Sequence, residues 1–258
     1  MYSFTHEDQK HYLGLRPIRP MSVSFKLTDY LNVAEINPPH TFGHISSTMQ
    51  FGTLGNTKAG DCVVAGSMHE IMVWTRASHG KQASFTEQGA LGLYSQVTGW
   101  DGTPDDATDT GLDMEYFAHY RRLQGIVDAA GVNHKVLGYA EIKGIENLIK
   151  ATWVFGAVGV GINFPSSAEE QFSEGRPWSP VAGATNQGGH YIPIVGMNSH
   201  GLLVCITWGR LQAISLEFLE RYMEQAVAYI SPDYLDPAKN LTPELLDLAT
   251  LQRDLAIL

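Results

Sequence analysis

The spacing of apolar positions changes part-way along the chain. In the first half, from Cys62 onward, apolar residues recur every three to four positions, which is the spacing of an apolar helix face. A glycine follows each run, and the residues Ser84–Glu87 have the pattern of a capping box. The sequence therefore predicts three helices, at residues 62–79, 84–99 and 112–123.

The second half of the chain has the pattern of an antiparallel sheet. Strand-like runs occupy residues 132–136, 157–162, 190–195 and 202–207, with a turn at 198–201 between the last two. Helical spacing marks 145–153 and, behind Ser215 as N-cap, 215–228, whereas 165–188 are predicted to form a loop. Helices followed by antiparallel strands predict an α+β fold of two subdomains.

The two ends are predicted to lie outside this domain. Residues 1–50 are polar and punctuated by prolines, and we expect an N-terminal arm over the surface with a short strand at 25–31. Residues 51–230 form the domain, with a helical part at about 60–125 and a sheet part at about 126–214 plus the helix 215–228. Residues 231–258 are an extension with a Leu-rich amphipathic helix after Thr242, which caps its own domain or docks on another chain.

The composition of the chain limits the kinds of binding partner and cofactor that we expect. A net charge of −10 without a basic stripe makes nucleic acid an unexpected partner. No run of about 18 apolar residues and no signal-peptide core are present, so we expect no membrane association and a cytoplasmic location. The two cysteines are expected to be free. Neither the acidic stretch 100–110 nor the pair His40 and His44 has the ligand spacing of a metal site, so no metal or cofactor is expected.

One cysteine stands where a nucleophile would be activated. Cys62 begins the first helix, whose partial positive charge favours a thiolate, and a nearby imidazole would favour it further. The best candidate for that imidazole is His190, which follows Gly189 at the start of a strand. Asn56 can place a side-chain N–H beside the Cys62 backbone N–H, and two such donors form an oxyanion hole for acyl transfer. The alternative is that Cys62 is a small buried core residue, as we expect for Cys205, and that His190 is a sheet residue.

The order of a loop amide, a helix-starting Cys, a distant Gly-His and a Trp-Gly pair resembles the papain-like cysteine peptidases. The resemblance covers roughly residues 50–210. Within this family, the chain is similar to divergent, uncharacterised members from bacteria and phages. It implies a helical subdomain that carries the Cys and packs on an antiparallel sheet or barrel that carries the His. It also implies that Cys62 attacks, His190 is the acid/base, Asn56 helps to form the oxyanion hole, and Trp208 packs over the His loop.

The sequence departs from this family in several places. Ile206 stands where the family has the Asn that orients the histidine ring, and Thr207 and Asn198 are the candidates to replace it. Asp61 would oppose thiolate formation if its carboxylate faced the sulfur. No inhibitory propeptide is recognisable in the 61 residues before Cys62.

Three functional hypotheses follow. The first is a papain-like thiol hydrolase, a cysteine peptidase or amidase, that acts on a peptide or protein through a Cys62 acyl-enzyme. The alternative is a catalytically weakened papain-fold protein with a structural or interaction role, for example a phage virion or assembly component, located in the virion. A third hypothesis keeps the chemistry and changes the acceptor, as in transamidation or cell-wall amide cleavage.

Overall fold

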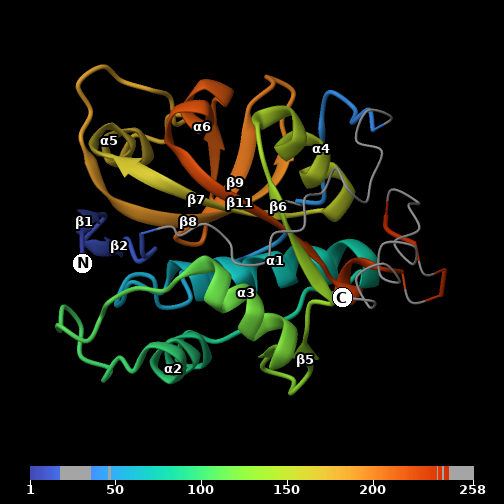
Figure 1. The fold of residues 1–258 in the computed structure, drawn as a ribbon, viewed down its shortest axis with the longest axis horizontal. Helices are drawn as coiled ribbons and strands as arrows, with labels where there is room; N and C mark the ends of the chain where they lie inside the picture. The colour runs from blue at the N-terminus through green and yellow to red at the C-terminus, as the bar shows by residue number, and fades with distance from the viewer. Residues whose placement is uncertain (18–35, 46–47, 237, 240, 244–258) are drawn as a thin grey trace.

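A computed structural model describes residues 1–17, 36–45, 48–236, 238, 239 and 241–243. The strand expected at 25–31 and the helix expected after Thr242 lie outside these residues, so the docking role of that helix stays a prediction. A helical layer lies below a large sheet, and further helices cover the far face of that sheet (Figure 1). The fold is α+β, as the sequence predicted.

The helical layer holds α1 (Cys62–His79), α2 (Glu87–Thr98) and α3 (Met114–Leu123). Helix α1 begins at the predicted cysteine and ends because Gly80 adopts a left-handed conformation, with φ of 67°. Helix α2 is capped by the Thr86 side chain, which accepts from the Gly89 N–H, so the capping box predicted from Ser84 is wrong by two positions.

The sheet is antiparallel, with strand order β10-β9-β8-β7-β11-β6 and the short β3 paired to β8. Two small hairpins, β1–β2 and β4–β5, stand apart from it. The strands are β1 (Ser3–His6), β2 (Gln9–Tyr12), β3 (Phe42–Gly43), β4 (Ile126–Val127), β5 (Asn133–His134), β6 (Gly138–Ile142), β7 (Val158–Pro165), β8 (Asn186–Met197), β9 (Leu203–Thr207), β10 (Arg210–Ile214) and β11 (Met223–Ile230). The remaining helices are α4 (Ile145–Phe155), α5 (Ser166–Ser173), α6 (Leu216–Tyr222) and the 3-10 turn η3 (Pro232–Tyr234).

Alternation along the strands divides the interior into two cores. On β8, Ile192 and Ile194 join the core that α4 and α6 cover, whereas Tyr191 and Val195 face the core that contains α1. Successive side chains of a strand point to opposite faces, so a single strand contributes to both cores. Cys205 belongs to the first core and is fully buried, as expected.

Two predicted elements of the second half are wrong. Residues 223–228, predicted as part of a helix, belong to β11, which pairs with both β7 and β6. An apolar run that is buried on both faces suits a central strand as well as a helix, so its spacing did not distinguish the two. The predicted loop 165–188 contains α5, and β6 and β10 were not predicted from the sequence.

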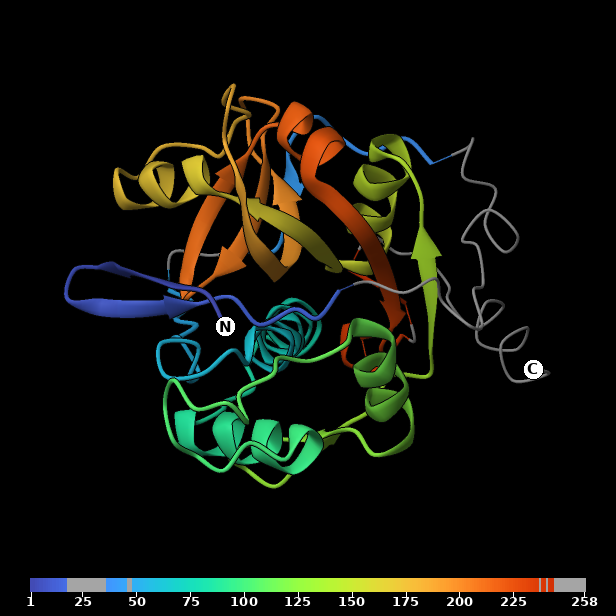
Figure 2. The ribbon, with the colours of Figure 1, turned by 60° about the vertical axis from the view of Figure 1, so that its left-hand side comes forward.

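The N-terminal residues do not form a surface arm. Hairpin β1–β2 and the segment after it run between the sheet and the helical layer (Figure 2). Phe4, Tyr12, Leu13 and Leu15 are buried there, since each can fill space that neither layer fills alone. The predicted arm is therefore wrong for residues 1–17.

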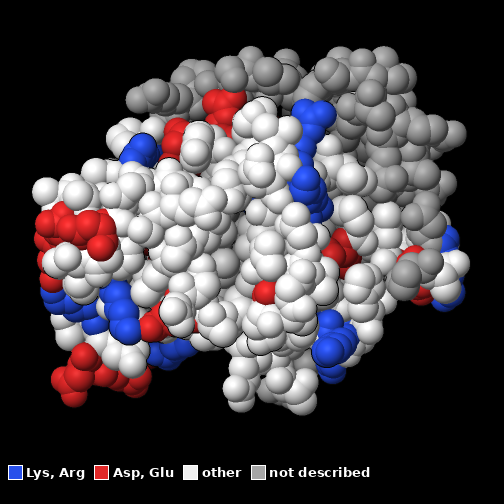
Figure 3. Space-filling model, turned by 90° about the horizontal axis from the view of Figure 1, so that it is seen from below, with Lys and Arg blue, Asp and Glu red and all other residues white. Residues whose placement is uncertain are grey.

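On the face seen from below, Lys and Arg side chains are scattered, and they form no large patch of positive charge (Figure 3). Among the described helices, none is long and apolar enough to cross a membrane.

Candidate active site

Cys62 begins α1 and is almost fully buried, with an exposed fraction of 2%. The backbone N–H groups of Tyr191, Gly14 and Val63 hydrogen-bond with its sulfur and favour the thiolate. Burial outweighs them and raises the pKa of the Cys62 thiol to about 12, so in this closed arrangement the group is a neutral thiol.

His190 lies on β8, beside the strand residue whose N–H faces Cys62. Its Nε2 is 2.8 Å from the Thr207 hydroxyl, and its ring stacks on Trp208 with a centroid distance of 4.4 Å. These two contacts fix the ring's orientation from its edge and its face. Burial, and then the nearby His11, lower the pKa of His190 to about 3, so the imidazole is neutral.

The Thr207 contact depends on a tight turn. Trp208 has φ of 44° and Gly209 has φ of 76°, and Thr207 pairs with Arg210 across them. Two left-handed residues between paired strands form a turn of type I′, which matches the twist of a β-hairpin. Thr207 bonds to the His190 ring, and the turn places the next residue, Trp208, over the face of the same ring.

Asn56 and Asp61 lie in the loop before α1. The Asn56 amide nitrogen donates to the Ala59 carbonyl at 3.1 Å, and an amide nitrogen carries a second N–H. Asp61 is fully buried, and burial followed by the nearby Asp109 raises its pKa well above the ordinary value. A neutral Asp61 carboxyl does not oppose a thiolate as a carboxylate would.

The structure brings most of the predicted site residues together. Asn56, Cys62, His190, Thr207 and Trp208 all line one cavity of about 10 Å³, which has room for about one water molecule. Gly189 precedes His190 on β8 and contacts the N-terminal segment.

The other candidates for orienting the histidine lie elsewhere. Asn198 accepts from the His200 and Leu202 N–H groups in the β8–β9 turn. It lies eight residues after His190 along the chain, or about 26 Å at strand spacing. Ile206 is fully buried and packs in the α1 core, although it also lines the cavity. Among the described residues, Thr207 is the one that bonds to the ring.

A buried charged network holds α1 against the sheet, and no pattern in the sequence indicated it. Glu70 accepts from Arg121 at 2.6 Å and from the Tyr191 hydroxyl at 2.6 Å. Burial raises the pKa of Glu70, while Arg121 and Tyr191 act in the opposite direction. Because Tyr191 follows His190, this network ties the helix of the cysteine to the strand of the histidine. Charged residues at helical spacing predict a solvated face, so only the tertiary structure shows the pairing.

No cluster of three His, Cys, Asp or Glu side chains suited to a metal ion occurs within the described parts of the chain.

Comparison with solved structures establishes the fold. The chain is similar to xylellain, a cysteine protease from Xylella fastidiosa, with a TM-score of 0.65, 12% identity, and coverage of 89% of this chain and 99% of that one. The chain has the papain-like fold. It is also similar to procathepsin B from Trypanosoma congolense (TM-score 0.59, 11% identity, 85% and 86% of the two chains) and to the proform of the ragweed protease Amb a 11 (TM-score 0.55, 19% identity, 82% and 70%). No family profile and no curated protein sequence matches the chain. At these identities the papain-like fold is shown, and the catalytic roles rest on the geometry of the site.

Proposed function

We propose that this protein is a thiol hydrolase that cleaves peptide or other amide bonds through an acyl-enzyme on Cys62. The observation that carries the proposal is the 2.8 Å contact between His190 and Thr207 in the cavity that Cys62 also lines. A hydrogen bond to one ring nitrogen fixes the ring and leaves the other nitrogen for proton transfer. His190 Nδ1 is buried and has no hydrogen-bond partner among the described residues.

The roles follow from this arrangement. His190 takes the Cys62 proton, the thiolate attacks the carbonyl carbon, and the same imidazole returns the proton to the leaving amine. The Cys62 backbone N–H and the second Asn56 side-chain N–H stabilise the oxyanion. Water, activated by His190, then releases the acyl group and restores the thiol.

The shape of a rate–pH profile tests this proposal. Iodoacetamide alkylation of Cys62, measured by peptide mapping, is expected to keep a plateau below pH 7, because a thiolate–imidazolium pair forms well below the ordinary thiol pKa of about 8.5. His190→Ala should abolish the plateau. Alkylation that follows ordinary thiol ionisation in both proteins would contradict the proposal. Cys205→Ser serves as the background, so that Cys62 is the one thiol measured.

A second candidate is a papain-fold protein whose site no longer turns over and which serves an interaction role. It is favoured by the burial of Cys62 and His190, which holds both groups neutral. The same profile separates the two candidates, since this one predicts no plateau below pH 7.

A further inference from the structure

Tyr191 follows His190 on β8 and lies along one face of helix α1. Its backbone N–H bonds to the Cys62 sulfur, and its hydroxyl donates to Glu70 at 2.6 Å. Between these two contacts its ring passes Gly66, where an added Cβ would lie 2.5 Å from the ring. Cys62, Gly66 and Glu70 are four residues apart, so they occupy successive turns of the same helix face. Tyr191 therefore contacts three successive turns of the helix that begins at the candidate nucleophile.

Two glycines form the slot that holds the Tyr191 ring. Gly66 of α1 faces the ring edge at Cδ1 and Cε1. Gly159 of β7 faces the opposite edge, where an added Cβ would lie 2.0 Å from the hydroxyl oxygen. Neither glycine has a positive φ, so the close approach of the ring, and not the backbone conformation, requires glycine at these two positions. The slot between the helix and the sheet is shaped for this side chain.

The carboxylate that accepts from the Tyr191 hydroxyl is held in place by a third element. Arg121 of α3 donates to Glu70 at 2.6 Å and to the Ser67 hydroxyl at 3.2 Å. Replacing a buried ion pair by apolar residues of similar volume often costs no stability. What this pair supplies is a fixed acceptor, because Oε2 of Glu70 bonds to Arg121 and Oε1 is left for Tyr191.

The contacts that orient the His190 ring all come from the sheet. Thr207 bonds to the ring from the end of β9, and Trp208 stacks on it from the turn that follows. They fix the imidazole relative to the sheet, but they do not fix its separation from Cys62, which begins α1. Tyr191 joins the two, because it neighbours His190 in the chain while its N–H and its hydroxyl both bond to residues of α1.

We infer that Tyr191 is a positioning residue, and that its bond to Glu70 sets the separation of the Cys62 sulfur from the His190 ring. This rests on the proposed function, since it assigns that sulfur and that ring to proton transfer. The attraction within a thiolate–imidazolium pair falls with separation, so a looser contact lowers the fraction of thiolate below pH 7. Above the ordinary thiol pKa the thiol ionises without the imidazole, and the separation no longer matters.

Tyr191→Phe on the Cys205→Ser background removes the hydroxyl and keeps the ring. The quantity to measure is the rate of Cys62 alkylation by iodoacetamide at pH 6 divided by the rate at pH 10. We expect this ratio to fall about fivefold or more, because only the rate at pH 6 depends on the thiolate–imidazolium pair. A loss of packing alone would admit more iodoacetamide at both pH values and leave the ratio unchanged.

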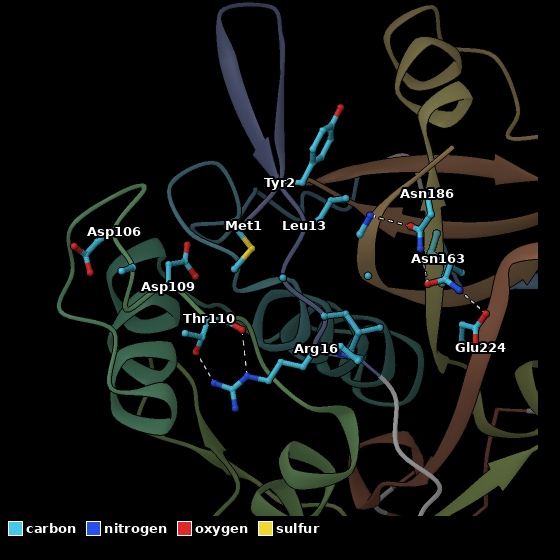
Figure 4. Close-up of a pocket in the computed structure, with 17 residues that line it drawn as sticks. Met1, Tyr2, Leu13, Arg16, Asp106, Asp109, Thr110, Asn163, Asn186 and Glu224 are labelled. Carbon is cyan, nitrogen blue, oxygen red and sulfur yellow. Dashed lines mark hydrogen bonds between the residues drawn. The ribbon is translucent and has the colours of Figure 1, made fainter. Parts of the chain in front are cut away.

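Two matched controls remove comparable contacts elsewhere. Tyr2→Phe takes away another tyrosine hydroxyl that donates to a carboxylate, that of Glu169 at 2.7 Å. Tyr2 lines an open cavity of about 820 Å³, and its ring points away from the other labelled side chains (Figure 4). Trp74→Phe removes the indole N–H that ties α1 to the Phe155 carbonyl at 2.8 Å, about 18 Å along the helix from Cys62. Both controls should keep the ratio of the parent protein.

A pair of double variants tests Glu70, and it decides the question if Tyr191→Phe does not fold. Glu70→Gln/Arg121→Met keeps an acceptor for the Tyr191 hydroxyl, whereas Glu70→Leu/Arg121→Met does not. We expect the first to keep the ratio and the second to lose it.

Equal ratios in the two double variants, or the parent ratio in Tyr191→Phe, overturn the inference, and so does an equal fall in either control. A parent protein without the plateau below pH 7 overturns the proposed function as well. A plateau that is present in the parent and survives in Tyr191→Phe overturns the positioning role alone.

Discussion

The buried pair of Glu70 and Arg121 gives the sharpest test of how the two subdomains are held. Their side chains are 0% and 1% exposed, and the guanidinium also lies 4.0 Å from the Tyr229 ring centroid. Arg121→Met keeps most of the volume and removes the charge, which leaves the Glu70 carboxylate with the Tyr191 hydroxyl. Breaking a buried pair in this way costs about 3–5 kcal/mol, and loss of the ring contact adds about 1 kcal/mol. We expect the free energy of unfolding to fall by about 4–6 kcal/mol.

The double variant separates the cost of leaving a buried charge without a partner from the cost of lost packing. In Glu70→Gln/Arg121→Met no charge is buried, and the Gln oxygen still accepts from Tyr191, so we expect a loss of only about 1–2 kcal/mol. The control is Lys150→Met, which breaks the surface pair with Glu146 and should change stability by less than about 0.5 kcal/mol. Urea unfolding followed by circular dichroism measures all three. A loss under about 1 kcal/mol in Arg121→Met, or a double variant less stable than the single, would refute the reasoning.

Three further predictions concern a ring, a glycine and a pH window. Thr207→Val should lower the alkylation plateau of Cys62 about tenfold or more by freeing the histidine ring, whereas Thr207→Ser, which keeps the hydroxyl, should retain it. Gly66→Ala should destabilise by about 1–3 kcal/mol, because its Cβ would lie 2.5 Å from the Tyr191 ring; Gly92→Ala should stabilise by up to about 1 kcal/mol, and equal shifts in thermal unfolding would contradict this. Burial lowers the pKa of His134, but bonding to Asp233 and Asp128 outweighs it, so the folded-state pKa is raised above the unfolded value of about 6.5. The stabilisation by His134 is therefore complete below that value and lost as pH rises through the folded-state pKa; His134→Gln should be more destabilising at pH 5.5 than at pH 9 in urea unfolding, and an equal loss at both would refute the assignment.

Local patterns were enough where one element carries its own signals. Helix α1 has an apolar face and a glycine stop, so its start at Cys62 and its end at His79 followed from the sequence. Strands β8 and β9 were predicted from strand-like runs separated by a turn, and this placed His190 on a strand. The resemblance to papain-like peptidases rested on these elements and led to the correct fold.

Patterns failed where long-range contacts decide the structure. Met223–Ile230 has apolar spacing that suits a helix, yet strands on both sides and cores on both faces make it β11. Ile206 stands where papain-like peptidases have an Asn, so the sequence left the orientation of the His190 ring open; in the structure Thr207, at the end of β9, bonds to this ring. Neither outcome has a local sequence signal.

The sequence by itself determined the helices and strands that carry Cys62 and His190, because helix stops and strand alternation are local properties of the chain. Only the tertiary structure decided that the first residues of the chain run between the subdomains, with Gly14 against Gly60. Main-chain hydrogen bonds and backbone contacts hold that segment in place. They depend on which segments meet in space, and side-chain patterns along the sequence do not record them.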